Sequence, residues 1–109
     1  MISLSQLQRS VENFTICLTQ ERYFDAHEAI ESLWFPFRMN SADEIKLLRA
    51  YINAAVSFEL HKRGRYKPSE RVWENFLKYQ PLLKNIDIRY KEQYKIAEKE
   101  ILKTRKKLI

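Results

Sequence analysis

Glycine and proline are scarce in this chain, with one glycine and three prolines among 109 residues. An all-β domain needs turn residues every ~8–12 positions, so this composition argues against one. Helices need far fewer turns, and hydrophobic residues at 45% are enough to build one core. The sequence therefore predicts an all-α fold, a compact single-domain bundle of about five helices over residues 1–109.

Five stretches of the chain repeat apolar residues at helical spacing. Gly64 follows a basic helix end, as is typical just past a helix C-terminus. Pro81 removes a backbone donor and clashes with the preceding turn, so we expect it to break or kink the fourth helix. No convincing internal repeat is visible. The expected helices cover about residues 3–20, 23–35, 42–63, 68–83 and 87–109, and the last of them is basic.

Small polar residues mark the expected helix starts. Ser3 or Ser5 is expected to cap the first helix, and Asp87 the last. Ser41, with Glu44 three positions later, matches a capping box at the start of the third helix. These signals agree with the helix boundaries that the apolar spacing predicts.

One helical segment, residues 24–34, carries polar side chains on the face that should be apolar. His27 and Glu31 lie four positions apart, close enough to meet, while Glu28 points away toward solvent. On the third helix, Glu59 lies on the face expected to be buried. A buried carboxylate needs a partner, and His27 is the natural one. The residues singled out are His27, Glu28, Glu31, Trp34 and Glu59.

Three interpretations of the group formed by His27, Glu31 and Glu59 stay open. The group is a buried polar lock that fixes the register of two helices, with the imidazole held protonated by two carboxylates. Alternatively it is a metal or acid–base site, since two carboxylates and a histidine suit a divalent metal. In the third interpretation, Glu59 or His27 simply reaches water at a helix end.

Specific catalytic patterns are absent from the sequence. His27 has Glu31 and not a second histidine four positions on, so the zincin spacing fails. The Glu-x-x-His pair of di-iron bundles is missing, and neither Ser32 nor Cys17 has a nucleophile context. We therefore assign no catalytic residue and expect a protein that is not an enzyme. No cofactor is expected, apart from a divalent metal at His27, Glu31 and Glu59.

Charge is distributed unevenly along the chain. Residues 1–60 hold five Lys or Arg and eight Asp or Glu, whereas residues 61–109 hold fifteen and six. Lysines recur every four positions on the last helix, which is typical either of a solvated face or of a site for RNA, DNA or another polyanion. Tyr90 and Tyr94 fall on the core side of this helix, unlike a stacking platform. The candidate polyanion-binding residues are Lys91, Lys95, Lys99, Lys103, Lys106 and Lys107.

The chain shows no sign of a membrane or secretory segment. No apolar run approaches the ~18 residues that a membrane span needs, and no basic leader precedes an apolar stretch at the start. The one cysteine, Cys17, lies on an apolar helix face and is expected to be a small core residue. These features predict a soluble cytoplasmic protein.

Two segments of the chain form a recognisable pattern: Phe24-x-x-His27-Glu28-x-x-Glu31-x-x-Trp34 and the alanine-rich helix ending in Lys62-Arg63-Gly64-Arg65. They resemble the domain of unknown function 309 family, small helical proteins of bacteria and archaea, and the resemblance covers about residues 20–80. Near Glu59 the family pattern has a histidine, so a two-histidine metal site does not carry over. The resemblance implies an all-α fold and no activity, since none is established for the family.

Two classes of function follow from these observations. The first is a non-enzymatic interaction or scaffolding domain, whose protein or polyanion partner contacts the basic second half. The second is a small metal-assisted hydrolase or other acid–base enzyme that uses His27, Glu31 and Glu59, and it requires that solvent reach these side chains. RNA or DNA binding through the last helix is a further alternative.

Overall fold

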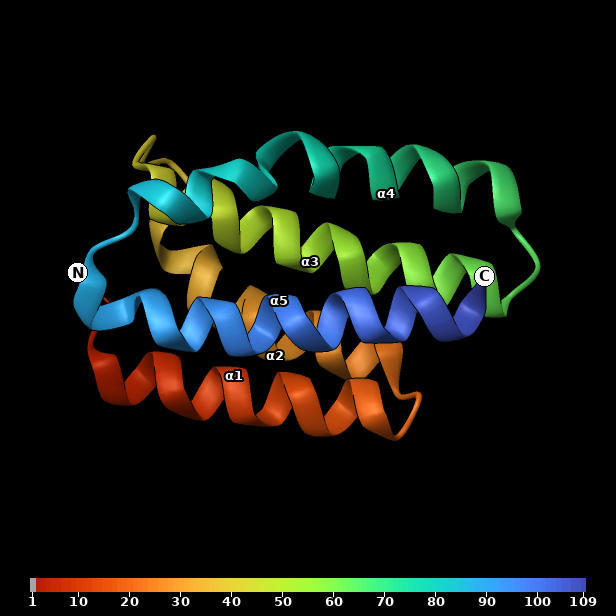
Figure 1. Ribbon diagram of the computed structural model, residues 1–109, viewed down its shortest axis with the longest axis horizontal. Helices are drawn as coiled ribbons and strands as arrows, with labels where there is room; N and C mark the ends of the chain where they lie inside the picture. The colour runs from red at the N-terminus through yellow and green to blue at the C-terminus, as the bar shows by residue number, and fades with distance from the viewer. Residues whose placement is uncertain (1) are drawn as a thin grey trace.

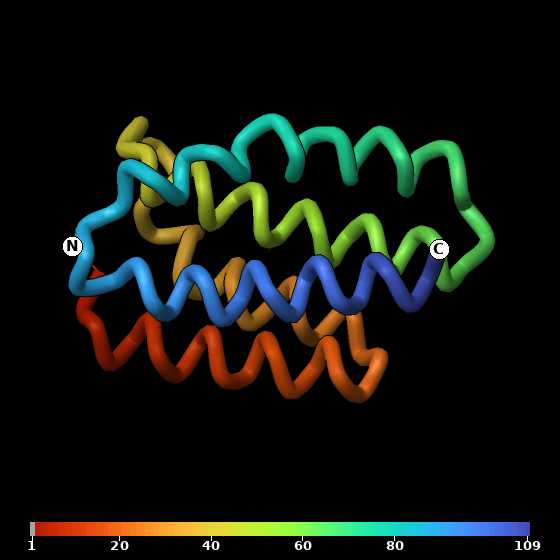
Figure 2. Tube along the Cα trace, in the orientation of Figure 1, coloured from red at the N-terminus to blue at the C-terminus, as the bar shows by residue number. Residues whose placement is uncertain are grey.

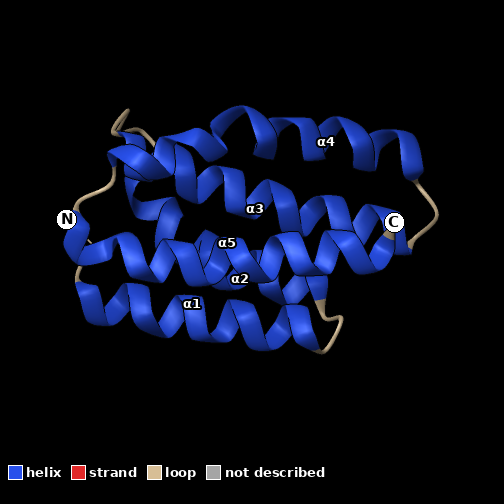
Figure 3. Cartoon of the chain, in the orientation of Figure 1, coloured by secondary structure: helices blue, strands red, loops and turns tan. Residues whose placement is uncertain are grey.

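Five α-helices account for most of the chain in the computed structural model, which describes residues 2–109. They are α1 (Leu4–Thr19), α2 (Tyr23–Trp34), α3 (Asp43–Lys62), α4 (Tyr66–Tyr79) and α5 (Ile88–Leu108) (Figure 1). Two 3-10 helices, η1 (Phe35–Phe37) and η2 (Gln80–Asn85), follow α2 and α4. The described residues contain no strand (Figure 3), so the predicted all-α bundle is confirmed.

The first four helices alternate in direction, and α5 then runs parallel to α1 and α3 (Figure 2). α2 packs against both α1 and α3, and α4 packs mainly on α3. α5 also packs against α1 and α3, and it lies in front of α2 in Figure 1. The pair α1 and α3 is therefore covered by α2 on one side and by α5 on the other. No helix among residues 2–109 is both long and apolar enough to cross a membrane.

The core consists mainly of the apolar faces that helical spacing predicts. α3 has ten buried residues, the most of any helix, as expected for a helix that is apolar on most sides. Cys17 is 7% exposed, which confirms its predicted core position, and Trp73 is also buried, at 6% exposure. Leu4, in the first turn of α1, is 39% exposed.

The structure confirms the predicted N-terminal cap of α1 but not the predicted cap of α3. The Ser3 hydroxyl accepts from the Gln6 N–H, and the Gln6 side chain accepts from the Ser3 N–H, so Ser3 caps α1. The predicted capping box at Ser41 is wrong. α3 begins after Ala42, whose N–H donates to the Asn40 side chain at 2.7 Å. The Asn40 amide oxygen accepts from this backbone N–H, and the helix starts one residue later than predicted.

Prolines mark the ends of α2 and α4. Pro81 ends α4 as predicted, and the chain continues through η2 until Asp87 caps α5 with its side chain. Pro36 lies in η1 in the same way after α2. α4 begins at Tyr66, two residues before the predicted start at Pro68, because proline is tolerated in the first turn of a helix.

The hairpins α1–α2 and α3–α4 are joined by the same connector. Glu21 and Gly64 have positive φ angles, 59° and 78°. The arginine after each has nearly the same backbone, with φ/ψ of −94°/72° at Arg22 and −92°/73° at Arg65. In both connectors two N–H groups donate back to the last helical turn, as in a Schellman motif. This repeat was not visible in the sequence, because only the Arg-Tyr pair recurs around it.

Candidate functional site

His27 and Glu31 lie on the flank of α2 and contact each other. The imidazole Nε2 is hydrogen-bonded to Glu31 Oε2, and the Phe24 ring lies edge-on, 5.6 Å from the imidazole centre. α2 turns Ala26 and Ile30 toward the core. The two polar side chains are consequently half-exposed, at 22% for His27 and 42% for Glu31.

Glu59 does not join this pair. Its Oε1 accepts from the Arg63 Nε at 3.0 Å, one turn further along α3, and its side chain is 22% exposed. The predicted buried lock of His27, Glu31 and Glu59 is therefore wrong in its burial. All three side chains lie where water reaches them, and the carboxylate finds an arginine on its own helix.

His27 and Glu59 nevertheless line one cleft between α2 and α3, with a volume of about 220 Å³. Its remaining walls are mostly aromatic and aliphatic, from Tyr23, Phe24, Val56, Leu60 and Arg63. Within residues 2–109, no three His, Cys, Asp or Glu side chains come together as a metal site. The structure thus provides a histidine–carboxylate pair beside a small cleft, and it does not assemble the three predicted ligands.

Tyr23 lines the same cleft and is 3% exposed. Its ring packs edge-on against Phe58, with 5.7 Å between ring centres. Burial raises the pKa of its hydroxyl, and the carboxylates of Glu21 and Glu59 raise it further. The Tyr23 hydroxyl therefore stays protonated and can only be a donor or a neutral acceptor in the cleft.

The end of α2 combines exposed and packed aromatic residues. Glu28 is exposed as expected, and Trp34 packs, partly buried, against the core. Phe35 is 50% exposed, and the Arg38 guanidinium lies 3.8 Å from its ring centre. One ring face of Phe35 is therefore already covered within the chain.

The lysines of α5 lie on its outward side. Lys91 is half-buried and donates to the Lys84 carbonyl at 3.2 Å, and the other five are exposed. Within residues 2–109, none of the six forms an ion pair. The lysines that recur every four positions line two grooves, one against η2 and one against α1. We call Lys91, Lys95, Lys99 and Lys103 the lysine ridge, and Lys106 and Lys107 extend it.

Arg105 belongs to the same basic end in the sequence but has a different environment. Its Nη2 donates to Glu70 Oε1 at 2.6 Å, and its guanidinium lies 4.7 Å from the Trp73 ring centre. The Arg105 side chain is only 20% exposed. It therefore ties α5 to α4 and does not extend the unpaired basic surface.

A buried polar contact was missed by sequence reasoning. The Ser57 hydroxyl donates to the Ser69 carbonyl at 2.8 Å, and the Ser69 hydroxyl donates to the Ser57 carbonyl at 2.7 Å. Both residues are buried, at 0% and 1% exposure. Nothing in the sequence marked Ser57 as buried, because its partner lies on another helix. The polar lock expected at His27 exists instead between α3 and α4.

A second buried contact links α3 to α5. The Tyr94 hydroxyl donates to Glu44 Oε2 at 2.6 Å, and the Tyr51 hydroxyl donates to the Tyr94 carbonyl at 3.0 Å. Burial raises the pKa of both tyrosines, and the Glu44 contact raises that of Tyr94 further. Both hydroxyls are therefore neutral donors that hold α5 in place.

Comparison with known proteins identifies one family. The sequence model described as "Domain of unknown function (DUF309)" matches residues 11–72, more than half of the chain. This match confirms the resemblance seen in the sequence. The matched segment runs from α1 into α4 and contains His27, Glu31 and Glu59, whereas α5 lies outside it. No curated protein and no solved structure matches the chain.

Proposed function

This chain belongs to the DUF309 family, whose description states no function, and we propose that it is an interaction module that binds an acidic partner through the lysine ridge of α5. One observation carries the proposal: the ridge lysines have no ion-pair partner among residues 2–109. Several arginines, by contrast, are paired with carboxylates: Arg22, Arg63 and, on α5 itself, Arg105. The unpaired cations of α5 are thus available to a partner.

The position of the ridge supports this function. Four lysines spaced every fourth residue cover about 18 Å along a helix. The opposite side of α5 is anchored in the core by Tyr94, Ala97 and Ile101, so the ridge is presented on a rigid element. Like charges at this spacing repel one another, and an acidic partner relieves the repulsion.

The test is a binding titration with two fluorescent probes, poly-glutamate and a DNA duplex of about 20 base pairs, at about 50 and 200 mM salt. The variant Lys95→Gln/Lys99→Gln/Lys103→Gln should weaken binding of the preferred probe at least about tenfold at low salt. If that probe is DNA, the slope of log affinity against log salt should fall by about 0.9 for each phosphate that the variant no longer neutralises.

The control is the triple variant Lys46→Gln/Lys67→Gln/Lys78→Gln, which removes the same charge from α3 and α4. It should change the affinity less than about threefold. Equal losses in the two triple variants would mean that binding follows net charge alone, and the assignment to α5 would be wrong. Failure of both probes to bind at low salt would remove the proposal altogether.

A second candidate function, acid–base or metal-assisted hydrolysis, rests on the cleft that His27 and Glu59 share. A metal there would require Glu59 to leave Arg63 and join His27 and Glu31. Equilibrium dialysis against Zn²⁺ or Mn²⁺ tests this directly. About one bound ion per chain, lost in His27→Ala, would favour the metal-assisted enzyme, and no uptake by the folded protein would discard that form.

A further inference from the structure

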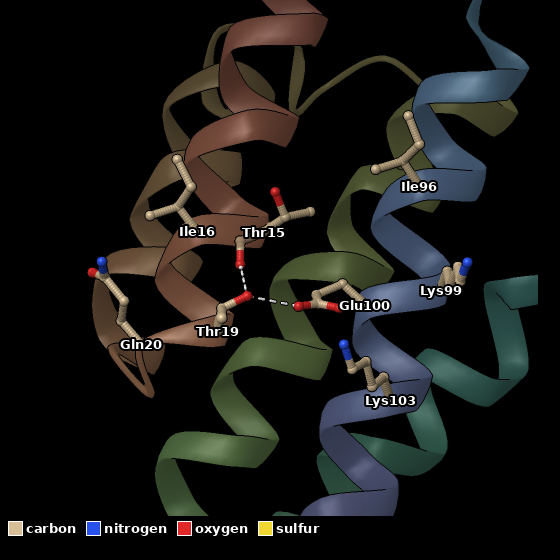
Figure 4. Close-up of a pocket in the computed structure, with 8 residues that line it drawn as sticks. All are labelled: Thr15, Ile16, Thr19, Gln20, Ile96, Lys99, Glu100 and Lys103. Carbon is tan, nitrogen blue, oxygen red and sulfur yellow. Dashed lines mark hydrogen bonds between the residues drawn. The ribbon is translucent and has the colours of Figure 1, made fainter.

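A groove of about 660 Å³ lies between α1 and α5. Figure 4 shows the lining side chains of α1 on one side and those of α5 on the other. The lysine ridge runs into this groove, because Lys99 and Lys103 are among its lining residues.

Each wall of the groove carries a large aliphatic side chain that is not buried. Ile16 is 43% exposed and Ile96 is 42% exposed. In Figure 4 the Ile96 side chain points across the groove toward α1. A partner that covers both isoleucines removes apolar surface from water, which favours binding.

The net charge of the groove lining is positive, because Lys99 and Lys103 outnumber the single carboxylate of Glu100. The Glu100 carboxylate accepts from the Thr19 hydroxyl at 2.7 Å, which links the two walls (Figure 4). Lys99 and Lys103 have no ion-pair partner among residues 2–109. A ligand that fits must therefore bring apolar groups to the isoleucines and negative charge to the lysines.

We propose that this groove binds an amphipathic helix with acidic residues, contributed by a partner protein. The inference rests on the proposed function and names its partner class. The lining segments, residues 15–20 and 96–103, extend over about two helical turns, and a helix presents apolar side chains at such spacing. Nucleic acid fits less well, because the groove offers aliphatic side chains and no aromatic ring for stacking. A second copy of this chain brings like charge, since each carries a net charge of +6.

The probe is a fluorescein-labelled peptide of about 16 residues, with leucine at every third or fourth position and glutamate elsewhere. A matched peptide carries lysine in place of glutamate. The acidic peptide should bind the full chain at least about tenfold more tightly than the basic one at about 50 mM salt. Amide chemical-shift changes should concentrate in residues 15–20 and 96–103.

Two pairs of variants separate the apolar contribution from the charge. Ile16→Gln/Ile96→Gln should weaken the acidic peptide at least about fivefold, as should Lys99→Gln/Lys103→Gln. The matched control Leu4→Gln/Leu102→Gln removes isoleucine-sized side chains that are 39% and 40% exposed on the same helices outside the groove. It should change the affinity less than about twofold. Circular dichroism melting curves identify any variant that is unfolded.

The outcomes distinguish this inference from the proposed function. If the lysine variant loses affinity and the isoleucine variant does not, the groove is excluded and the ridge remains a binding site. If DNA binds and the acidic peptide does not, the inferred helical partner is wrong, while the proposed binding of an acidic partner to the lysine ridge still holds. If neither binds, both proposals fail. A dimer in sedimentation experiments that the isoleucine variant abolishes would assign the groove to a second copy and overturn the inference.

Discussion

The hairpins α1–α2 and α3–α4 turn through the same connector, yet their second helices have different surroundings. α2 packs against two long helices, α1 and α3, whereas α4 packs mainly on α3. Tyr23 and Tyr66 follow the connector at the same position and are 3% and 60% exposed. The local sequence therefore determines the turn, and the neighbouring helices determine which side chains after it are buried.

The interface inside each hairpin differs in the same way. When the two hairpins are aligned on their connectors, Phe14 and Ala26 of the first hairpin correspond to Ser57 and Ser69 of the second. All four residues are buried. An apolar pair and a pair of mutually bonded serines thus occupy equivalent places. The serine pair is stable because each buried hydroxyl has a hydrogen-bond partner.

The largest expected effect separates the two tyrosines. Tyr23→Ala should lower the free energy of unfolding by about 3–5 kcal/mol, because it leaves a cavity against Phe58. Tyr66→Ala is the matched control and should cost less than about 0.5 kcal/mol. Urea denaturation of both variants measures the difference. Similar losses of unfolding free energy in the two variants would show that α4 is covered on both sides in solution. The contrast between α2 and α4 would then be wrong.

The serine pair should give the next largest effect. Ser57→Ala and Ser69→Ala should each lower the free energy of unfolding by about 1 kcal/mol. The double variant should cost less than the sum, because the two hydroxyl oxygens are 3.1 Å apart and interact directly. Ser32→Ala, at an exposed serine, is the control, and urea denaturation measures all four variants. Additive losses would mean that the two serines act independently.

Reciprocal substitutions in the two connectors should change the stability of the protein in opposite directions. Glu21→Gly should stabilise the protein by about 1 kcal/mol, because glycine adopts positive φ without the strain of a Cβ atom. Gly64→Glu should cost about the same amount. A Cβ atom at Gly64 meets no other atom within 4 Å, so the cost there comes from the backbone alone. Thermal unfolding of both variants checks whether the connectors are equivalent, and a loss of stability in Glu21→Gly would contradict it.

The smallest effects concern the half-exposed charges of the two second helices. His27 pairs with Glu31 inside α2, whereas Glu70, at the equivalent place in α4, pairs with Arg105 of α5. His27→Gln and Glu70→Gln should each cost less than about 1 kcal/mol in urea denaturation, as exposed ion pairs do. Glu70→Gln should cost more, since it also frees the guanidinium above Trp73. A loss of unfolding free energy above about 2 kcal/mol in His27→Gln would instead favour the buried polar lock.

Much of the fold was predictable, because helical spacing and turn residues act locally. The helix count, the core position of Cys17, the Asp87 cap and the break at Pro81 follow from such short-range rules. The repeated connector was not predictable, because Glu21 replaces the glycine that usually marks a left-handed turn. Backbone geometry recurs there with only the Arg-Tyr pair in common.

The candidate site was predicted in its residues but not in its arrangement. His27 and Glu31 contact each other as their spacing requires, because both lie on one helix. Whether Glu59 joins them depends on the rotation of α2 against α3, and the sequence contains no measure of such a rotation. A nearby Arg63 was enough to take the carboxylate. The burial of Ser57 escaped prediction for the same reason, since its partner Ser69 lies on another helix.

The return of α5 to pack beside α1 has a consequence for how the protein folds. Contacts within each hairpin join segments close in sequence, and loops of this kind close at low entropic cost. α5 contacts α1 across a long sequence separation, and it is synthesised after both hairpins. During synthesis the two hairpins can therefore form first, with one side of α1 and α3 still open to water. We expect docking of α5 to be the step that closes the core, so the order of synthesis and the order of assembly coincide.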